Sequence, residues 1–197
     1  MGHRVSILAA SYSHVRSVQP KVKSDVETET IDGVKYIWIK TSEYSGNNLR
    51  RVFNMLEFSG KLYAQKILFE RPDIVIDSST YPLTIFGSYK IAKMNGAKLI
   101  FEVHDLWPLS PVELGGYSRL HPFIMIMQFA ENFSYTHAQR VVSLLPCAGH
   151  HMQLHGMTSD KFVYIPNGID ISEWKLHGEL PEEHQILFNK LKRDKNF

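Results

Sequence analysis

Cysteine is nearly absent from this chain of 197 residues, and so are long apolar runs and a strong net charge. The one cysteine, Cys147, excludes an internal disulfide and indicates a reducing compartment. No segment approaches the ~18 apolar residues of a membrane-spanning helix, and the apolar segment 5–10 is too short for a secretory signal. The formal net charge of +2 is too small to indicate a nucleic-acid-binding protein. These absences predict a cytoplasmic protein that does not bind nucleic acid.

Several common active-site motifs are missing as well. No G-x-G-x-x-G follows the first predicted strand, which argues against dinucleotide binding of the dehydrogenase kind. The P-loop pattern G-x-x-x-x-G-K-[ST] does not occur, so the chain is not a P-loop nucleotidase. The G-x-S-x-G nucleophile turn of the α/β-hydrolases is also absent.

Histidines gather near residue 150, where they raise the question of a metal site. His151 and His155 have the i, i+4 spacing of a zinc pair on a predicted helix, and His150 adds an imidazole on another face. The segment 152–154 between them lacks the glutamate of a H-E-x-x-H protease. Exposed histidines near the C-terminal end of a helix, where the helix dipole favours positive charge, explain the same pattern. We adopt this simpler interpretation, and we predict no metal site and no cofactor.

The chain does contain a regular alternation of predicted strands and helices. Predicted strands cover 4–10, 26–30, 34–40, 73–77, 98–103, 140–144 and 162–165, and predicted helices cover 48–70, 81–95, 123–137 and 146–155. The second and third strands flank Asp32-Gly33, a strong hairpin signal. Repeated strand–helix–strand units are typical of a parallel sheet covered by helices. The prediction is an α/β fold with a single Rossmann-like, doubly wound and mainly parallel sheet.

The composition changes after residue 170. Residues 1–170 hold all the predicted strands, so we assign them to one domain. Residues 171–197 are polar and charged, contain no predicted strand and end in Lys-Leu-Lys-Arg-Asp-Lys-Asn-Phe. We expect this tail to be a linker that leads toward a further domain.

Two loops offer candidate site residues. His104 and Asp105 follow the predicted strand 98–103 and open a loop, rich in proline and glycine, that extends to about residue 120. In open α/β sheets ligands bind beyond the carboxyl ends of the strands, and long loops there usually carry function. An imidazole can donate or accept a hydrogen bond, and Asp105 could fix its tautomer or hold a sugar hydroxyl. From chemistry alone an equal alternative stays open, in which Asp105 caps a turn and His104 only packs.

The loop after the first strand reaches the same edge of the predicted sheet. Ser13, His14 and Arg16 offer a hydroxyl, backbone N–H groups and a guanidinium that suit a phosphate. A plain surface loop is the alternative interpretation.

Four segments, in this order, carry a family resemblance: FEVHDLWP (101–108), PVELGG (111–116), VVSLL (141–145) and YIPNGID (164–170). Together they resemble the N-terminal half of family-4 retaining glycosyltransferases of the GT-B fold, in particular bacterial enzymes of capsule or O-antigen synthesis. The resemblance implies two Rossmann-like domains that face each other across a cleft. The N-terminal domain recognises a lipid-linked saccharide acceptor, and the C-terminal domain, which would lie beyond residue 197, binds the nucleotide-sugar donor.

The resemblance also implies roles for individual residues. His104 matches a histidine placed against the donor sugar, and it is assigned to catalysis together with Asp105. Arg16 corresponds to a basic residue that approaches the donor diphosphate, and Ser13 and His14 stand where many members carry a Gly-Gly pair. Glu113, within PVELGG, is assigned to substrate binding.

For the protein as a whole, the resemblance implies metal-independent sugar transfer and weak peripheral contact with the inner face of the cell membrane. It also implies that this half is inactive alone. Two alternatives remain open at this stage. One is a single-domain subunit of a split glycosyltransferase that acts with a separate donor-binding partner. The other is an unrelated flavodoxin-like domain that binds a sugar phosphate.

Overall fold

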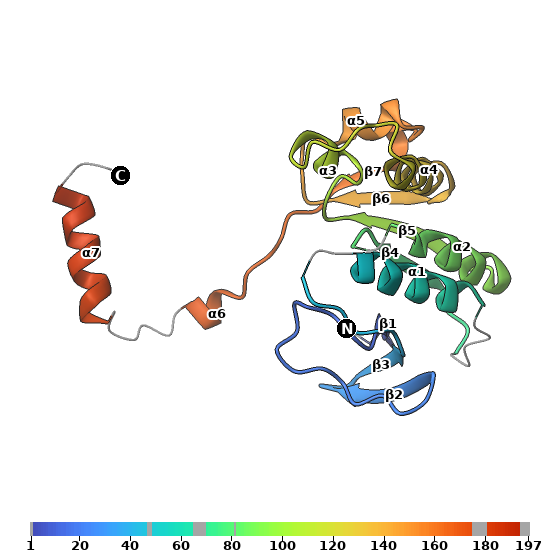
Figure 1. The fold of residues 1–197 in the computed structure, drawn as a ribbon, viewed down its shortest axis with the longest axis horizontal. Helices are drawn as coiled ribbons and strands as arrows, with labels where there is room; N and C mark the ends of the chain where they lie inside the picture. Colours follow the sequence, from blue (N-terminus) through green and yellow to red (C-terminus); the bar gives the residue numbers. More distant parts are fainter. Residues whose placement is uncertain (1, 47–48, 65–69, 81, 175–180, 194–197) are drawn as a thin grey trace. The chain divides into compact units, whose positions relative to one another are not determined.

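The structure, a computed structural model, describes residues 2–46, 49–64, 70–80, 82–174 and 181–193. The chain divides into two units, Met1–Pro166 and Asn167–Phe197. The strands are β1 (Ser6–Ala10), β2 (Val26–Ile31), β3 (Val34–Ile39), β4 (Ile74–Ser78), β5 (Lys98–Val103), β6 (Arg140–Ser143) and β7 (Phe162–Tyr164). The helices are α1 (Leu49–Ala64), α2 (Thr84–Asn95), α3 (Leu109–Glu113), α4 (Pro122–His137), α5 (Gly149–Leu154), α6 (Ile171–Trp174) and α7 (Glu182–Arg193), with a 3-10 turn at Ser159–Lys161. Figure 1 shows their arrangement.

The first sheet has the order β1-β3-β2. β2 and β3 are antiparallel, with Ile31 opposite Val34, so the predicted hairpin is confirmed. Its two turn residues, Asp32 and Gly33, have φ values of 49° and 80°. A tight hairpin turn with two positive φ angles favours Asp-Gly, because glycine and aspartate tolerate this conformation best. β1 joins the other edge of β3 in parallel.

The second sheet is entirely parallel and has the order β4-β5-β6-β7. Side chains of β5 alternate, with Leu99, Phe101 and Val103 buried on one face of the sheet. They form the main core with apolar residues of α2, α4 and α5, among them Ile85 and Tyr135. This alternation of strands and helices confirms the predicted Rossmann-like α/β class.

The structure differs from the prediction in dividing the strands between two sheets. The apolar stripe of α1 explains the division, since Phe58 and Leu62 pack against Ala10 and Ile39 of the first sheet. The same cluster includes Ile91 of α2, so α1 contacts the first sheet on one side and α2 on the other. The predicted helix 48–70 also ends earlier in the described residues, because α1 ends at Ala64, 65–69 lie outside them and residue 70 is not helical.

The segment predicted as a loop from 104 to about 120 contains the short helix α3, so that prediction is wrong in part. Pro111 lies in the first turn of α3, where a proline costs no intrahelical hydrogen bond. The Val112 N–H donates to the Pro108 carbonyl at 3.2 Å, which closes this turn. A proline near the start of a helix is therefore compatible with the helix, even within a segment rich in proline and glycine.

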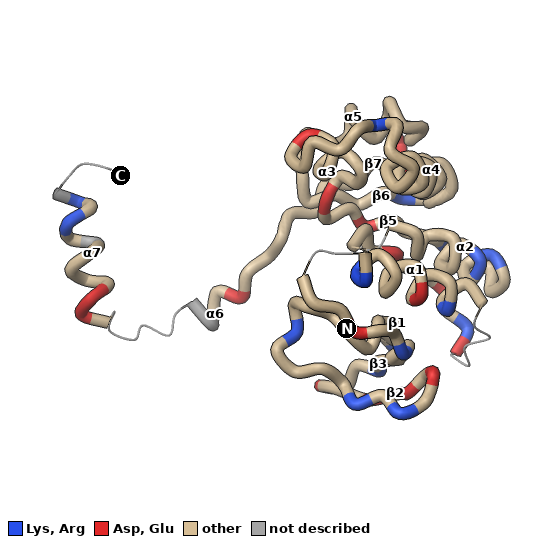
Figure 2. The backbone as a smooth tube through the Cα atoms, in the orientation of Figure 1, with Lys and Arg blue, Asp and Glu red and all other residues tan. Residues whose placement is uncertain are grey.

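The C-terminal unit, taken by itself, contains α6 and α7 and no strand in its described part. The first turn of α7 carries Glu182 and Glu183, and Lys190 and Lys192 lie near its end, as Figure 2 shows. This distribution matches the helix dipole, which favours acidic groups at the N-terminus and basic groups at the C-terminus. The described residues beyond 170 contain no strand, and helix α7 was not predicted.

Candidate active site at the strand ends

The loop that begins at His104 is anchored by Ser79, which follows the neighbouring strand β4. The backbone N–H of His104 donates to the Ser79 hydroxyl at 2.9 Å, and the N–H of Asp105 lies 3.5 Å from it. The Ser79 N–H in turn donates to the Glu102 carbonyl at 2.9 Å. Only 3% of Ser79 is exposed, so these bonds are shielded from water. They fix the point at which the chain leaves the carboxyl edge of the sheet.

The imidazole of His104 faces solvent beside a carboxylate. Its Nε2 lies 3.1 Å from Oε2 of Glu102, and 43% of each side chain is exposed. The pair forms a hydrogen bond, which becomes an ion pair when the imidazole is protonated. Because the carboxylate binds one ring nitrogen, it orients the ring and leaves the other nitrogen available to a ligand.

Asp105 is exposed and lines a narrow cavity that runs below the loop. The cavity is lined by Ser79, Pro82, Phe101, Val103, Asp105, Trp107, Glu131, Ser134 and Tyr135. Burial raises the pKa of the Glu131 carboxyl to about 7, although hydrogen bonds from Tyr135 and Gln128 lower it. An exposed carboxyl and a buried one therefore line the same cavity, near the carboxyl ends of β4 and β5.

Arg16 does not point freely away from the first loop. Its NH2 group donates to the carbonyl of Ala10 at 2.6 Å, and its NH1 group donates to that of Ser11 at 3.3 Å. The guanidinium carbon also lies 4.9 Å from the centre of a Trp38 ring, within cation–π range. In this conformation Arg16 holds the loop against the end of β1, and contact with a diphosphate would require it to exchange these partners.

Ser13 and His14 are bound by residues of the loops that follow β1 and β3. The Ser13 N–H donates to Oε1 of Gln19 at 3.1 Å, and the Gln19 amide donates back to the Ser13 carbonyl at 2.7 Å. Nδ1 of His14 lies 2.8 Å from the Tyr44 hydroxyl. These bonds give the loop a defined shape while His14 remains exposed.

Glu113 is the last residue of α3, and its Oε1 accepts a hydrogen bond from Arg119 at 3.1 Å. Both side chains are exposed, so the ion pair contributes little to stability.

The structure thus brings His104 and Asp105 together through Ser79. The partners named above for Ser13, His14 and Arg16 all belong to the first sheet and its loops. Ser79 and Glu102 were missed by sequence reasoning. The hydroxyl-rich segment 78–80, directly after a predicted buried strand, was the signal that could have indicated the first of them.

A buried carboxyl also lies within β4. Only 4% of Asp77 is exposed, and its Oδ1 accepts a hydrogen bond from the Ser88 hydroxyl at 2.6 Å. Burial raises the pKa of Asp77 to about 7, while hydrogen bonds from Ser88 and Thr84 act in the opposite direction. Asp77 therefore changes charge near neutral pH, inside the layer between β4 and α2.

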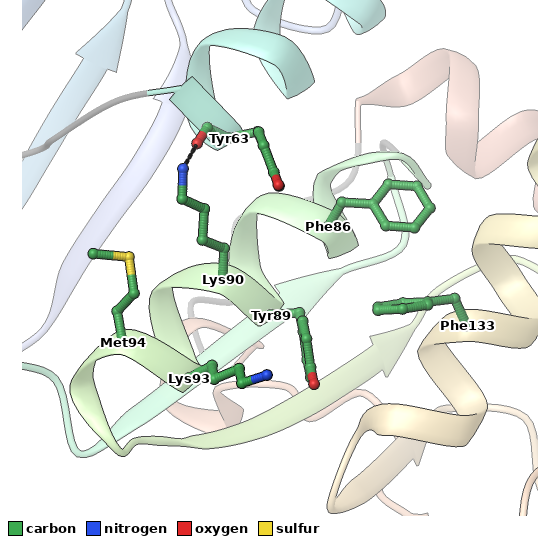
Figure 3. Close-up of a pocket in the computed structure, with 7 residues that line it drawn as sticks. All are labelled: Tyr63, Phe86, Tyr89, Lys90, Lys93, Met94 and Phe133. Carbon is green, nitrogen blue, oxygen red and sulfur yellow. Dashed lines mark hydrogen bonds between the residues drawn. The ribbon is translucent and has the colours of Figure 1, made fainter.

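A larger hollow of about 460 Å³ lies elsewhere and is mainly aromatic (Figure 3). It is lined by Tyr63, Phe86, Tyr89, Lys90, Lys93, Met94 and Phe133. In a parallel α/β unit the helix runs back from the carboxyl ends of the strands to their amino ends. Lys90, Lys93 and Met94 belong to the second half of α2, so the hollow opens toward the edge of the sheet opposite His104. It is not part of the strand-end site.

The family described as glycosyl transferase 4-like domain matches residues 1–168. The chain belongs to this family and is a glycosyltransferase-type domain. No curated protein matches the sequence. Among the described residues no helix is both long and apolar enough to cross a membrane.

One solved structure with a detectable likeness is that of Anabaena Alr3699/HepE in complex with UDP-glucose. The two chains superpose with a TM-score of 0.41 and 15% sequence identity. The match covers 78% of this chain and 36% of the Anabaena chain, so this chain spans little more than a third of that protein. A likeness at this level is too low to carry an argument about function.

Proposed function

We propose that this chain is the N-terminal, acceptor-side half of a retaining GT-B glycosyltransferase. The enzyme moves a sugar from a nucleotide-sugar donor to a lipid-linked saccharide acceptor in capsule or O-antigen type polysaccharide synthesis. The observation that carries the proposal is the family match over 1–168, within which His104 and Asp105 lie at the carboxyl edge of a parallel sheet. Ligands of open α/β sheets bind at this edge.

The geometry around His104 suits the positioning of a sugar. One ring nitrogen is bound by Glu102, and the backbone N–H is bound by Ser79, so both the ring and the loop have a preferred orientation. A positioned hydrogen bond to a sugar hydroxyl helps to hold the sugar while its bond to the diphosphate breaks. Asp105 supports the same role from the adjacent cavity.

In this proposal the donor is held by a second Rossmann-like domain, and transfer requires both halves. Arg16 reaches the donor diphosphate after exchanging its present carbonyl partners, with Ser13 and His14 beside it, and Glu113 contacts the acceptor. The reaction itself proceeds without a metal ion at the transferred sugar, because positioning groups and the second domain supply the stabilisation.

Contact with a lipid-borne acceptor is supported by the surface of α1. Leu49, Phe53 and Leu56 are exposed and follow the i, i+4, i+7 spacing of one helix face. Arg50 and Arg51 lie on the same first turn. Two further basic residues, Lys61 and Lys66, belong to the predicted helix 48–70. Lys61 does not contribute to membrane contact, because it is held by Glu57 at 2.9 Å and by the Lys40 carbonyl at 2.8 Å. Lys66 lies outside the described residues. We propose weak, peripheral binding of this face to the inner leaflet.

The test compares the chain with the proposed two-domain enzyme, a longer protein that carries a donor-binding domain after residue 197. Both are incubated with radiolabelled nucleotide sugars and with lipid extract, and sugar transfer and donor hydrolysis are measured. The longer protein is expected to label the lipid fraction, and the chain alone is expected to show neither transfer nor hydrolysis. Turnover by the chain alone would overturn the half-enzyme proposal, and an inactive longer protein that binds no nucleotide sugar would overturn the proposed activity.

A further inference from the structure

A cluster of potential metal ligands joins two helices on the covered face of the second sheet. Glu131 comes from α4, His151 from α5, and His155 directly follows α5. One ligand atom of each residue lies within 4.8 Å of the other two. Sequence spacing pointed to the two histidines but not to the carboxylate, which is remote in sequence and reaches them only through packing.

The carboxyl group of the cluster is buried, and one of its imidazole nitrogens has no hydrogen-bond partner. Only 4% of Glu131 is exposed. Nε2 of His151 is buried, makes no hydrogen bond and lies 3.5 Å from Oε1 of Glu131. A buried nitrogen without a partner is costly, because it has lost water and gained nothing in exchange.

Several polar atoms beside the cluster share a single amide group. The amide nitrogen of Gln128 lies 2.7 Å from Oε2 of Glu131, 2.8 Å from Oδ1 of Asn132 and 2.9 Å from Nδ1 of His155. An amide NH2 group carries two hydrogens, so it serves two of these three atoms at a time, and Nδ1 of His155 also lies 3.1 Å from Oδ1 of Asn132. The site therefore gathers carboxylate oxygens and imidazole nitrogens, the atom types that bind zinc, within a few ångströms of one another.

We propose that Glu131, His151 and His155 form a binding site for a divalent cation of the zinc class that ties α4 to α5. Two imidazoles and one carboxylate are ligands that zinc prefers, and a water would complete a tetrahedron. At metal–ligand distances of about 2.1 Å, two ligand atoms of a tetrahedron lie about 3.4 Å apart. The 3.5 Å between His151 Nε2 and Glu131 Oε1 already matches this separation. Small side-chain rotations bring His155 in from within 4.8 Å.

The surrounding groups provide the outer support that metal sites need. The Tyr135 hydroxyl donates to Oε1 of Glu131 at 2.9 Å, and Gln128 donates to Oε2. Hydrogen bonds of this kind orient a ligating carboxylate. Because Glu131 and Tyr135 also line the cavity below Asp105, the cation fixes one wall of that cavity. Its role is to position helices and not to contact the transferred sugar.

The experiment measures zinc binding by the chain after removal of metals with a chelator. Isothermal titration is expected to give one equivalent of zinc with saturation in the micromolar range or below, and thermal unfolding is expected to shift upward. Mg²⁺ and Ca²⁺, which prefer oxygen-only sites, are expected to cause no shift. Replacement by Co²⁺ is expected to give the visible absorption of a tetrahedral site.

Variants locate the bound ion. His155→Gln, at a half-buried position, is expected to weaken zinc binding by about 100-fold or more, and Tyr135→Phe by about tenfold to 100-fold. His150→Gln is the matched control, since it removes an exposed neighbouring imidazole outside the cluster. If the chain binds no zinc, or if His155→Gln and His150→Gln bind it as wild type does, the proposal is overturned.

Discussion

Asp77 makes the stability of this protein depend on pH in an unusual direction. Its pKa rises from 3.8 to about 7 on folding, because the carboxyl is buried between β4 and α2. The folded state therefore keeps a proton that the unfolded chain has lost. A group of this kind contributes stability that is fully present below pH 3.8 and is lost as the pH rises through about 7.

The magnitude follows from the size of this shift. One pKa unit corresponds to about 1.4 kcal/mol, so raising the pH from 5 to 8 is expected to remove about 2 to 3 kcal/mol through Asp77 alone. Asp77→Asn keeps the shape and an oxygen that can accept from Ser88, but it cannot ionise. The variant is therefore expected to lose this part of the pH dependence and to exceed wild type in stability at pH 8.

The assay is urea unfolding followed by circular dichroism at several pH values between 5 and 8. Glu131 also has a pKa raised to about 7, so wild type and variant both retain a dependence of the same sign from that residue. The informative quantity is the difference between the two curves. Asp73→Asn, at an exposed position just before β4, is the control and should follow wild type. Parallel curves for Asp77→Asn and wild type would refute the reasoning.

Three further outcomes are expected. In the proposed two-domain enzyme, His104→Ala should lower kcat by about tenfold to 100-fold with little change in the donor KM, since one positioned hydrogen bond contributes about 1–3 kcal/mol. A near-normal kcat would show that His104 only shapes the loop. Ser79→Ala should reduce the free energy of unfolding by about 1–3 kcal/mol in the same urea assay, because the His104 N–H loses its acceptor. Thr80→Ala, at an exposed neighbouring position, is the control and should have little effect. The chain should co-sediment with anionic but not with neutral vesicles at low salt, and Phe53→Ser should weaken this binding. Equal binding to both vesicle types would contradict the proposed membrane contact of α1.

Local sequence signals predicted the strands and most helices of the fold. β5 was predicted with its observed bounds, because a buried strand lies between Gly96 and the polar pair His104-Asp105. The turn at Asp32-Gly33 was predicted because few residues tolerate two consecutive positive φ angles. Helix α3 was missed because its segment is rich in proline and glycine, although Pro111 lies in the first turn, where a proline is tolerated.

The features that were not predicted depend on contacts between distant segments. The division into two sheets results from how α1 packs between the first sheet and α2, and no local period encodes such a contact. Glu102 became part of the candidate site because it shares a strand face with the exposed ring of His104, two residues away. Glu131 approaches His151 only after α4 and α5 have packed on the same sheet. The positions of His104 and Asp105 were predictable because strand ends define an edge, whereas their partners were not.

The order β4-β5-β6-β7 has a consequence for how the protein is made. Each strand of this sheet after β4 pairs with the strand that precedes it in the chain, so every new pairing closes only the connection between two consecutive strands. Short closures cost less chain entropy than long ones, and they favour rapid formation of structure. The sheet can therefore form strand by strand, in the order of the sequence, while the ribosome is still adding residues. Each completed unit presents a ready edge to the next.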